Sequence, residues 1–252
     1  MTTAAKLIDL TLPGSPGGSA GLTALLGVPA GEGPWPGVVL VHEAFGLTDV
    51  MRRQVVRMAE AGYLALMPNL FTEGGPRRCL MATFRALQAG EGRAFVDIES
   101  ARTFLTGRSD CTGQVGVLGF CMGGGFALVA AARGFDAASV NYGRLPVDVD
   151  AALVGACPIV ASYGATDASL KGAAGKFEGA LVRSGVPHDV KEYPGAGHAF
   201  LNDAESGPRV LRFVLRRILG AGPDPVAAAD AWQRIDAFFG AYLTTPKKAP
   251  GS

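Results

Sequence analysis

The stretch that most constrains the fold covers residues 114–132 and reads Q-V-G-V-L-G-F-C-M-G-G-G-F-A-L-V-A-A-A. Its first part, residues 115–118, is a short apolar run typical of a strand buried in a parallel sheet. Its last part, residues 126–132, is rich in Ala and Leu and predicts a helix. Between them, residues 119–123 read G-F-C-M-G, which fits the pattern of a nucleophile between two spaced glycines.

A strand that turns sharply into a helix forces the central residue into a strained backbone, and the flanking glycines give that turn its clearance. We therefore expect the Cys121 thiol at the carboxyl end of the sheet, above the positive end of the following helix. Two plainer interpretations compete. A Cys in such a joint is commonly a small buried hydrophobe, and the uncharged run 115–132 has the length of a membrane span. The glycine cluster and the arginine-bearing flanks favour a strand and a helix over a span.

The composition bounds the class of protein more than its function. The 252 residues are 48% hydrophobic and include 36 glycines, which suits one α/β domain over residues 1–252. The formal net charge is +1, so it gives no argument for nucleic-acid or membrane binding. Asp9 interrupts the apolar core that a signal peptide requires, and we expect a cytoplasmic protein. No C-x-x-C pair and no zinc-ligand spacing link the four cysteines, so free thiols are expected at Cys79, Cys111, Cys121 and Cys157.

Strand and helix patterns alternate along the rest of the chain. Strands are expected at 6–12, 22–28, 38–41, 63–67, 137–142, 157–163 and 189–193, and helices at 49–61, 97–105, 168–184, 209–219 and 226–242. Residues 1–30 are expected to supply an antiparallel edge hairpin, 71–92 to be less regular with a helical segment, and the polar tail 244–252 to fray. The alternation predicts a doubly wound, mostly parallel sheet with helices on both faces, which binds ligands beyond the carboxyl ends of its strands.

A nucleophilic Cys121 requires a base, and the base requires an orienting group; both are expected later in the chain. Asp167 lies in the loop after the 159–163 strand pattern, and His198 lies in a Gly-rich loop after residues 190–193. Taken singly, such an Asp is often a helix N-cap and a loop His is often a surface residue. The order Cys, Asp, His, with each at a strand end, favours a catalytic triad.

The strand at 38–41 runs into His42-Glu43-Ala44-Phe45-Gly46. A hydrolase supplies its second oxyanion donor here, and we expect the backbone N–H groups of Met122 and Ala44 to act as the two donors. Glu43 would then lie near Cys121. A carboxylate disfavours the thiolate, while a charged His and a helix N-terminus favour it. Because these influences oppose each other, the hypothesis is a neutral resting thiol hydrogen-bonded to Glu43. The plainer alternatives are a surface loop residue for Glu43 and a hydrogen-bonded spectator for His42, and for His42 the spectator is favoured.

These motifs, with Y-G-A-T-D at 163–167 and A-G-H-A-F at 196–200, resemble the dienelactone hydrolase family over about residues 38–239. The resemblance implies an α/β-hydrolase fold that uses no cofactor and no metal. It implies that Cys121 attacks an ester or lactone carbonyl, that His198 moves the proton and that Asp167 orients the imidazole. It also implies that Glu43 accepts the thiol proton when substrate enters.

One departure from the family concerns substrate binding. Family members that act on dienelactones hold the substrate carboxylate with arginines, one of them shortly after the catalytic histidine, but residues 200–203 here read F-L-N-D. Candidates for the other anchor of the carboxylate are Arg77, Arg78 and Arg85, for which a solvated helix face is the plainer interpretation. Phe45 and Phe200 are further candidates for substrate contact.

The sequence thus predicts a monomeric, cytoplasmic hydrolase of a small-molecule ester or lactone that works through an acyl-thiol intermediate. It predicts neither a nucleic acid nor a membrane as partner. One alternative is a thioesterase or a general aryl or carboxylesterase on the same fold. Another is a non-catalytic ligand-binding or thiol-redox protein that keeps the fold.

Overall fold

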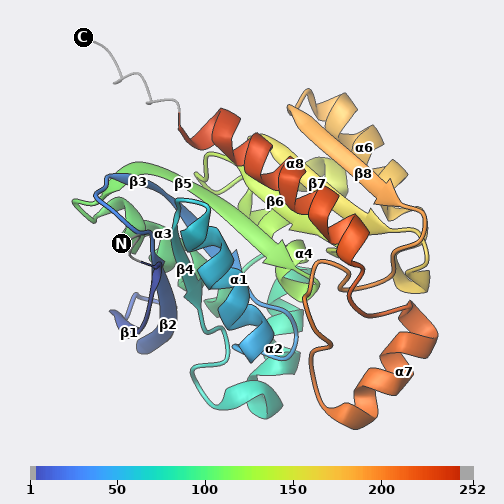
Figure 1. The fold of residues 1–252 in the computed structure, drawn as a ribbon, viewed down its shortest axis with the longest axis horizontal. Helices are drawn as coiled ribbons and strands as arrows, with labels where there is room; N and C mark the ends of the chain where they lie inside the picture. Colours follow the sequence, from blue (N-terminus) through green and yellow to red (C-terminus); the bar gives the residue numbers. More distant parts are fainter. Residues whose placement is uncertain (1–3, 245–252) are drawn as a thin grey trace.

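The computed structural model describes residues 4–244, which contain an eight-stranded sheet in the order β1-β2-β4-β3-β5-β6-β7-β8 (Figure 1). The strands are β1 Lys6–Pro13, β2 Gly21–Val28, β3 Trp35–Val41, β4 Leu64–Pro68, β5 Cys111–Phe120, β6 Ala138–Asn141, β7 Ile159–Gly164 and β8 His188–Tyr193. β1 pairs antiparallel with β2, and β2 with β4; the other neighbours run parallel. The expected hairpin is therefore present, with β1 at the edge and β2 inside the sheet.

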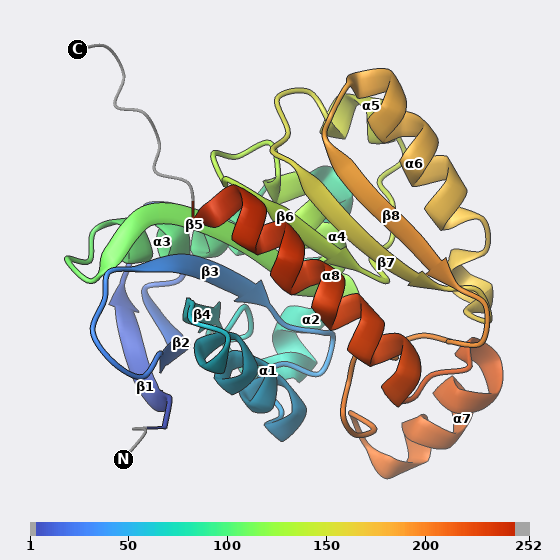
Figure 2. The ribbon, with the colours of Figure 1, turned by 45° about the horizontal axis from the view of Figure 1, so that its top comes forward.

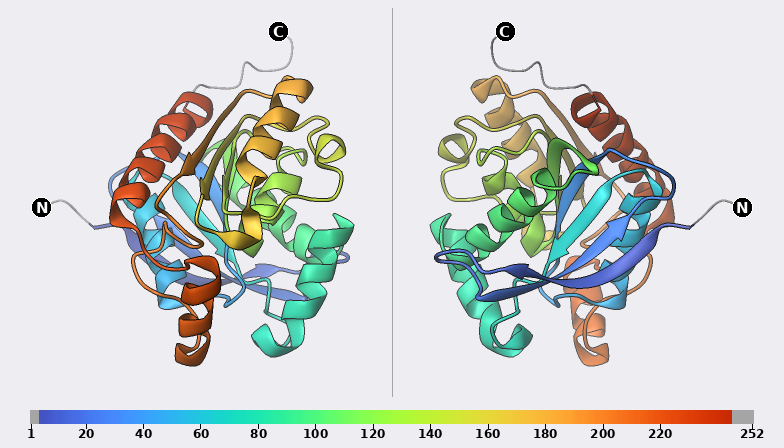
Figure 3. Two further views of the ribbon diagram at one scale, coloured as in Figure 1. Left: turned by 90° about the vertical axis from the view of Figure 1, so that its right-hand side faces the viewer. Right: turned by 90° about the vertical axis from the view of Figure 1, so that its left-hand side faces the viewer.

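Helices cover both faces of the sheet (Figure 3). They are α1 Asp49–Glu60, α2 Gly75–Ala89, α3 Arg93–Thr106, α4 Met122–Ala130, α5 Val149–Ala152, α6 Ala173–Ser184, α7 Arg209–Leu219 and α8 Pro225–Leu243, with a short 3₁₀ helix, η1, at Ala168–Leu170. α1 and α8 lie on one face, where α8 crosses the middle of the sheet (Figure 2). α3, α4 and α6 pack on the other face. The predicted doubly wound, mostly parallel α/β fold is confirmed.

The join between β5 and α4 is the centre of the core. β5 is buried from Gln114 onward, and every residue of α4 except Val129 is buried. α4 begins at Met122, four residues before the helix expected from the Ala/Leu-rich segment. The intervening glycines are poor helix formers, yet tertiary packing requires them. A Cβ on Gly123 would lie 2.0 Å from the Val41 carbonyl oxygen, so only glycine lets the helix approach β3 this closely.

Two helices start earlier, or are more regular, than expected. The segment 71–92 contains a 15-residue helix, α2, which has Pro76 in its first turn and ends at Gly90 in the left-handed conformation. α3 begins at Arg93, so Asp97 does not mark its start. Asp97 is buried and accepts hydrogen bonds from the Ser19 N–H and hydroxyl at 2.7 and 2.8 Å, which fasten α3 to the β1–β2 turn.

The helix expected over 168–184 is interrupted. Gly172, with φ of 73°, separates η1 from α6, because a left-handed residue cannot continue a right-handed helix. The four-residue helix α5 was not predicted; Asp148 caps it by accepting a hydrogen bond from the Ala151 N–H. Of the tail expected to fray, residues 245–252 lie outside the described residues. Among residues 4–244, no helix combines the length and apolarity that crossing a membrane requires.

Candidate active site

Cys121 occupies the sharp turn between β5 and α4 that the glycine pattern predicts. Its backbone has φ of 56° and ψ of −115°, a conformation unusual for a residue with a side chain. The Cys121 N–H donates to the Asn141 carbonyl at 3.1 Å, which anchors the turn to β6. A Cβ on Gly119 would lie 1.9 Å from the Gly123 carbonyl oxygen, so the turn leaves no room for a larger residue there. The thiol is half-buried above the N-terminus of α4.

Asp167 and His198 come together from the loops after β7 and β8. The His198 Nδ1 lies 2.5 Å from Asp167 Oδ2. The other carboxylate oxygen, Oδ1, accepts hydrogen bonds from the Ser169 N–H at 3.0 Å and hydroxyl at 2.6 Å. Asp167 therefore caps η1 and holds the imidazole at once, so the two interpretations of this residue are compatible. Burial alone would raise the pKa of Asp167, but the hydrogen bonds from His198 and Ser169 lower it below the ordinary value.

The His198 imidazole is fixed from several sides. Its backbone N–H donates to the Leu219 carbonyl and its own carbonyl accepts from the Gly222 N–H, at 3.1 and 3.0 Å. The Tyr142 ring lies 5.2 Å away, centroid to centroid. Burial lowers the pKa of His198, but the charge and hydrogen bond of Cys121 and the Asp167 carboxylate outweigh it and raise this pKa to about 10. The imidazolium is therefore strongly favoured while the sulfur is charged.

Glu43, after β3, lines the same cavity as Cys121 and His198. Its side chain is buried, with the residue only 3% exposed, and Oε2 accepts a hydrogen bond from Asn202 Nδ2 at 3.1 Å. Oε1 is buried with no hydrogen-bond partner among the residues described. Asn202, noticed in the sequence only because it is not an arginine, holds the carboxylate in place. The expected hydrogen bond from the Cys121 thiol to Glu43 is therefore not seen among the residues described, and Glu43 keeps one free acceptor in the cavity that it shares with Cys121.

The two expected oxyanion donors come from different segments: Met122 directly follows Cys121, and Ala44 lies in the loop after β3. Met122 is the first residue of α4, so its N–H is one of the donors that a helix N-terminus leaves unpaired within the helix. Ala44 lines the cavity beside Glu43. The close contact between α4 and β3 at Gly123 holds these two segments in register. This arrangement is compatible with the expected role of the Met122 and Ala44 N–H groups as oxyanion donors.

His42 is a structural histidine, as the favoured interpretation had it. It is fully buried; the Leu70 N–H donates to its Nε2 at 3.1 Å, so Nδ1 carries the proton and donates to the Glu43 carbonyl at 2.7 Å. Burial lowers the pKa of His42 to about 4. The ring therefore stays neutral and fixes the backbone on which Glu43 and Ala44 lie.

Tyr142 is a residue of the site that the sequence analysis missed. It follows β6 with a positive φ of 41°, packs between His198 and Phe200, and has its hydroxyl buried without a hydrogen-bond partner among the described residues. Burial, followed by the charges of Glu43 and Cys121, raises the pKa of Tyr142 well above its ordinary value. Its place directly after a central strand was the available signal, because side chains at the carboxyl ends of parallel strands share one edge.

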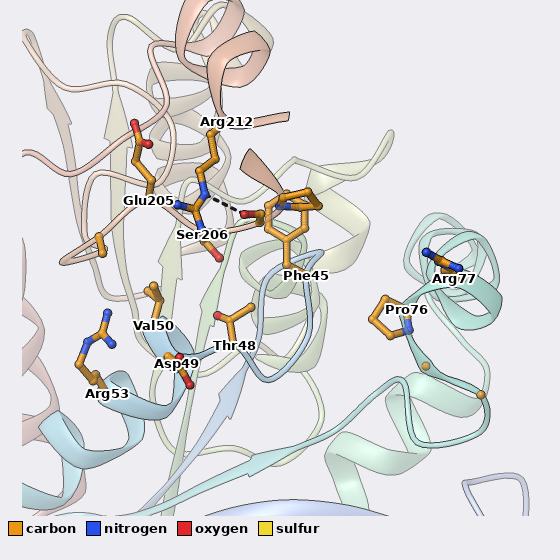
Figure 4. Close-up of a pocket in the computed structure, with 15 residues that line it drawn as sticks. Phe45, Thr48, Asp49, Val50, Arg53, Pro76, Arg77, Glu205, Ser206 and Arg212 are labelled. Carbon is orange, nitrogen blue, oxygen red and sulfur yellow. Dashed lines mark hydrogen bonds between the residues drawn. The ribbon is translucent and has the colours of Figure 1, made fainter. Parts of the chain in front are cut away.

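The space around the thiol has two parts. An inner cavity of about 150 Å³ contains the side chains of Cys121, His198 and Glu43 in its lining. A wider outer groove of about 850 Å³ adjoins it between the start of α2 and the segment leading into α7 (Figure 4). Phe45 lines both, and a Cβ on Gly207 would lie 2.6 Å from its ring. The contact between Phe45 and Gly207 therefore forms part of the wall between cavity and groove.

The arginines expected near the substrate are distributed differently. Arg77 lines the outer groove, whereas Arg78 and Arg85 are exposed on α2 and line neither space. The cation that borders both spaces is Arg212 of α7, which donates to the Gly207 carbonyl at 2.7 Å. Its position depends on how the loop 203–208 folds back, which residue spacing does not reveal.

Phe200 is not placed for substrate contact. Its side chain is fully buried in the core, with ring centroids 5.7 Å from Tyr142 and 5.0 Å from Tyr193, and it does not line the cavity. The turn that presents His198 to the cavity directs Phe200 inward. Of the two candidate phenylalanines, only Phe45 borders the space beside the thiol.

The sheet order and the strand-end position of this site define an α/β hydrolase. A Pyrococcus horikoshii acylaminoacyl peptidase, 14% identical, shares the fold with a TM-score of 0.71 over 100% of this chain and 44% of that one. The chain belongs to the dienelactone hydrolase family, whose model matches residues 22–243. A Klebsiella pneumoniae protein described as a candidate dienelactone hydrolase is 25% identical, with a TM-score of 0.78 over 95% of this chain and 100% of that one.

Among relatives by sequence, a carboxymethylenebutenolidase of Rhodococcus opacus is 30% identical over 222 residues, which cover 82% of this chain and 81% of that protein. Together with the family match, this establishes that the protein is a hydrolase.

Proposed function

We propose that the protein hydrolyses carboxylic esters or lactones through an acyl-thiol intermediate, with Cys121 as nucleophile, His198 as acid and base, and Asp167 as the group that orients the imidazole. The observation that carries the proposal is the 2.5 Å contact from Asp167 to His198, in a cavity that His198 shares with the Cys121 sulfur. This order of acid, base and nucleophile is the one that nucleophilic acyl transfer requires.

In the proposed reaction, the Cys121 thiolate forms a bond to the carbonyl carbon, and the displaced electron pair moves onto the carbonyl oxygen. The N–H groups of Met122 and Ala44 stabilise this oxyanion. When the tetrahedral species collapses, the C–O bond to the alcohol breaks and the His198 imidazolium protonates the leaving oxygen. Neutral His198 then takes a proton from water as that water attacks the thioester. The acid leaves, and the thiolate and the imidazolium are restored.

Glu43 gives the resting thiol a second base. The raised pKa of His198 favours a thiolate–imidazolium pair, whereas the negative charge of the Glu43 carboxylate, whose Oε1 is an unused acceptor, favours a neutral thiol. We propose that substrate entry tips this balance toward the thiolate: the S–H bond of Cys121 breaks and its proton moves to the neutral His198 imidazole, which gives the thiolate–imidazolium pair. A thiol that is neutral at rest would be less exposed to oxidation, which follows thiolate character.

The volumes of the inner cavity and the outer groove limit how a substrate fits. Ligand pockets usually measure about 300–1,000 Å³, so the inner cavity of about 150 Å³ holds only the reacting part of an ester. The rest would pass Phe45 into the outer groove. The named substrate of the Rhodococcus opacus relative, a lactone, motivates a lactone as first choice for this chain as well.

A substrate panel tests the proposal. An aryl lactone, p-nitrophenyl acetate and an S-acyl thioester should separate a lactonase from an aryl esterase and a thioesterase by their kcat/KM values. Mass spectrometry of the quenched reaction should find the acyl group on the Cys121 peptide. Turnover of none of the three, with Cys121 found only as a sulfenate or mixed disulfide, would favour a thiol-redox protein instead.

A further inference from the structure

α7 has two faces of different character. On its inner side, Arg212, Leu215 and Leu219 line the cavity that holds the thiol. No residue of the helix is buried, although its sequence, R-V-L-R-F-V-L-R-R-I-L, is rich in large apolar side chains. At 100° per residue, its outer side carries Val210, Phe213 and Val214 with Arg217 among them, and Ile218 lies at the margin of this side.

The outer side is strongly exposed. Val210 is 81% exposed, Phe213 69% and Ile218 60%. Single exposed apolar residues are ordinary, but several large ones on one side of one helix mark an interaction surface. The helix projects from the body of the molecule at the end where the outer groove opens (Figures 1 and 3).

The two helices at this end carry charge of one sign, although Asp49 and Glu205 line the groove between them. α2 and α7 border the outer groove from opposite sides, and neither helix contains an Asp or Glu. Together they carry seven arginines. Arg216 pairs with Glu205 and Arg212 donates to a backbone carbonyl. Within residues 4–244 the other five form no ion pair; they are Arg77, Arg78, Arg85, Arg209 and Arg217. A net charge of +1 for the whole chain conceals this local excess.

A second copy of the chain fits this surface poorly. Stable protein interfaces use about 20–30 residues on each side, far more than the outer side of an 11-residue helix offers. An isologous contact would also bring Arg209 and Arg217 of two copies together, and like charges oppose association. Exposed apolar side chains beside unpaired arginines are instead typical of helices that lie in the interface of an anionic membrane.

We propose that α7, supported by the arginines of α2, docks this end of the molecule on an anionic phospholipid surface. Val210, Phe213 and Ile218 would enter the boundary between headgroups and acyl chains, while the arginines contact lipid phosphates. The outer groove would then open toward the bilayer. Docking does not depend on the chemistry of the thiol, so it is measurable independently of any hydrolysis.

Flotation of the full-length protein with vesicles tests the proposal. Vesicles of equimolar phosphatidylcholine and phosphatidylglycerol should bind the protein, with binding that falls as salt rises, and vesicles of phosphatidylcholine alone should bind it weakly. Arg209→Gln combined with Arg217→Gln should weaken binding by on the order of tenfold or more, because each basic residue at an anionic surface contributes about fivefold. Phe213→Glu should abolish it.

Matched changes on α6 control for charge and surface polarity. Lys176→Gln with Arg183→Gln removes the same charge, and Val182→Glu changes a side chain that is 63% exposed, close to the 69% of Phe213. These variants should bind vesicles as the unchanged protein does, and all variants should keep their hydrolysis of a small soluble ester. Absence of vesicle binding would overturn the proposal. So would sedimentation showing a dimer that Phe213→Glu dissociates, since the surface would then be occupied by a second copy.

Discussion

Two histidines follow strands of the same sheet, His42 after β3 and His198 after β8, and their pKa values move in opposite directions. His42 is surrounded by backbone groups and apolar atoms; burial lowers its pKa to about 4. His198 is nearly as enclosed, but Cys121 and Asp167 raise its pKa to about 10. The comparison teaches that burial keeps an imidazole neutral unless charged partners stand beside it. The His42 ring consequently stays neutral and fixes the neighbouring backbone, whereas the His198 ring can carry a proton.

Removing the sulfur should produce the largest effect. Cys121→Ala is expected to lower kcat/KM for p-nitrophenyl acetate by on the order of a thousandfold or more, since the proposed nucleophile is lost. Because the sulfur is the first of the influences that raise the His198 pKa, NMR titration should also show that pKa falling, while that of His42 stays unchanged. Full esterase activity in this variant would mean that the nucleophile is another residue.

Changing the orienting carboxylate should come next. Asp167→Asn is expected to lower kcat by on the order of a thousandfold, because an amide can hold the imidazole in the wrong tautomer and cannot stabilise its charge. Ser169→Ala is the matched control, since it removes another partner of Asp167 and leaves the contact with His198 in place. We expect this control to lose less than about tenfold in kcat. Equal losses in the two variants would assign Asp167 to the cap of η1 alone.

The two histidines should also shift protein stability in opposite pH windows. Unfolded His42 binds a proton near pH 6.5 and the folded form only near 4, so the free energy of unfolding should fall by roughly 3 kcal/mol as pH drops across that range. His198, whose folded pKa lies above the unfolded value, stabilises the fold fully below pH 6.5 and loses that contribution as pH rises toward 10. In urea titrations, His42→Gln should remove the pH dependence of the free energy of unfolding only between about pH 4 and 6.5. His198→Gln should remove it only between about pH 6.5 and 10.

The smallest change is expected at Glu43. Glu43→Gln removes the charge that opposes the thiolate, so alkylation of Cys121 by iodoacetamide should extend to lower pH and quicken by about tenfold near neutrality. Asn202→Ala, which frees the same carboxylate without neutralising it, is the matched control. An alkylation profile identical to that of the unchanged protein would mean that Glu43 and the thiol are not coupled.

Much of the fold was predictable because it depends on local patterns. The apolar run of β5 and the glycines that flank Cys121 specify a strand, a turn and a helix within a few residues. The length of α2 was underestimated because Gly74, Gly75 and Pro76 resemble a loop, although such residues also begin helices. The break at Gly172 depends on a positive φ that an isolated glycine does not announce.

The candidate site was predictable only where strand ends determine it. Asp167 and His198 lie in the short loops that follow β7 and β8, so parallel pairing of these strands brings them to one edge. Asn202 and Arg212 reach the cavity through a loop and an exposed helix, whose paths depend on long-range packing. Tyr142 occupies a strained backbone position that residue type does not suggest. Phe200 was predicted as a substrate contact, but the positive φ of 60° at Ala199 lies between it and His198, and its ring is buried in the core.

The absent side chain of Gly123 bears on how this enzyme can be altered. A methyl group on Gly123 would collide with the Val41 carbonyl oxygen, so the segments that carry Met122 and Ala44 are packed against each other without spare room. Evolution and protein engineering therefore have little freedom at the reacting centre and considerable freedom at residues 203–220, whose side chains are mostly exposed. New substrate preferences in this chain are best sought by randomising that outer segment while the thiol and its proposed oxyanion donors are left untouched.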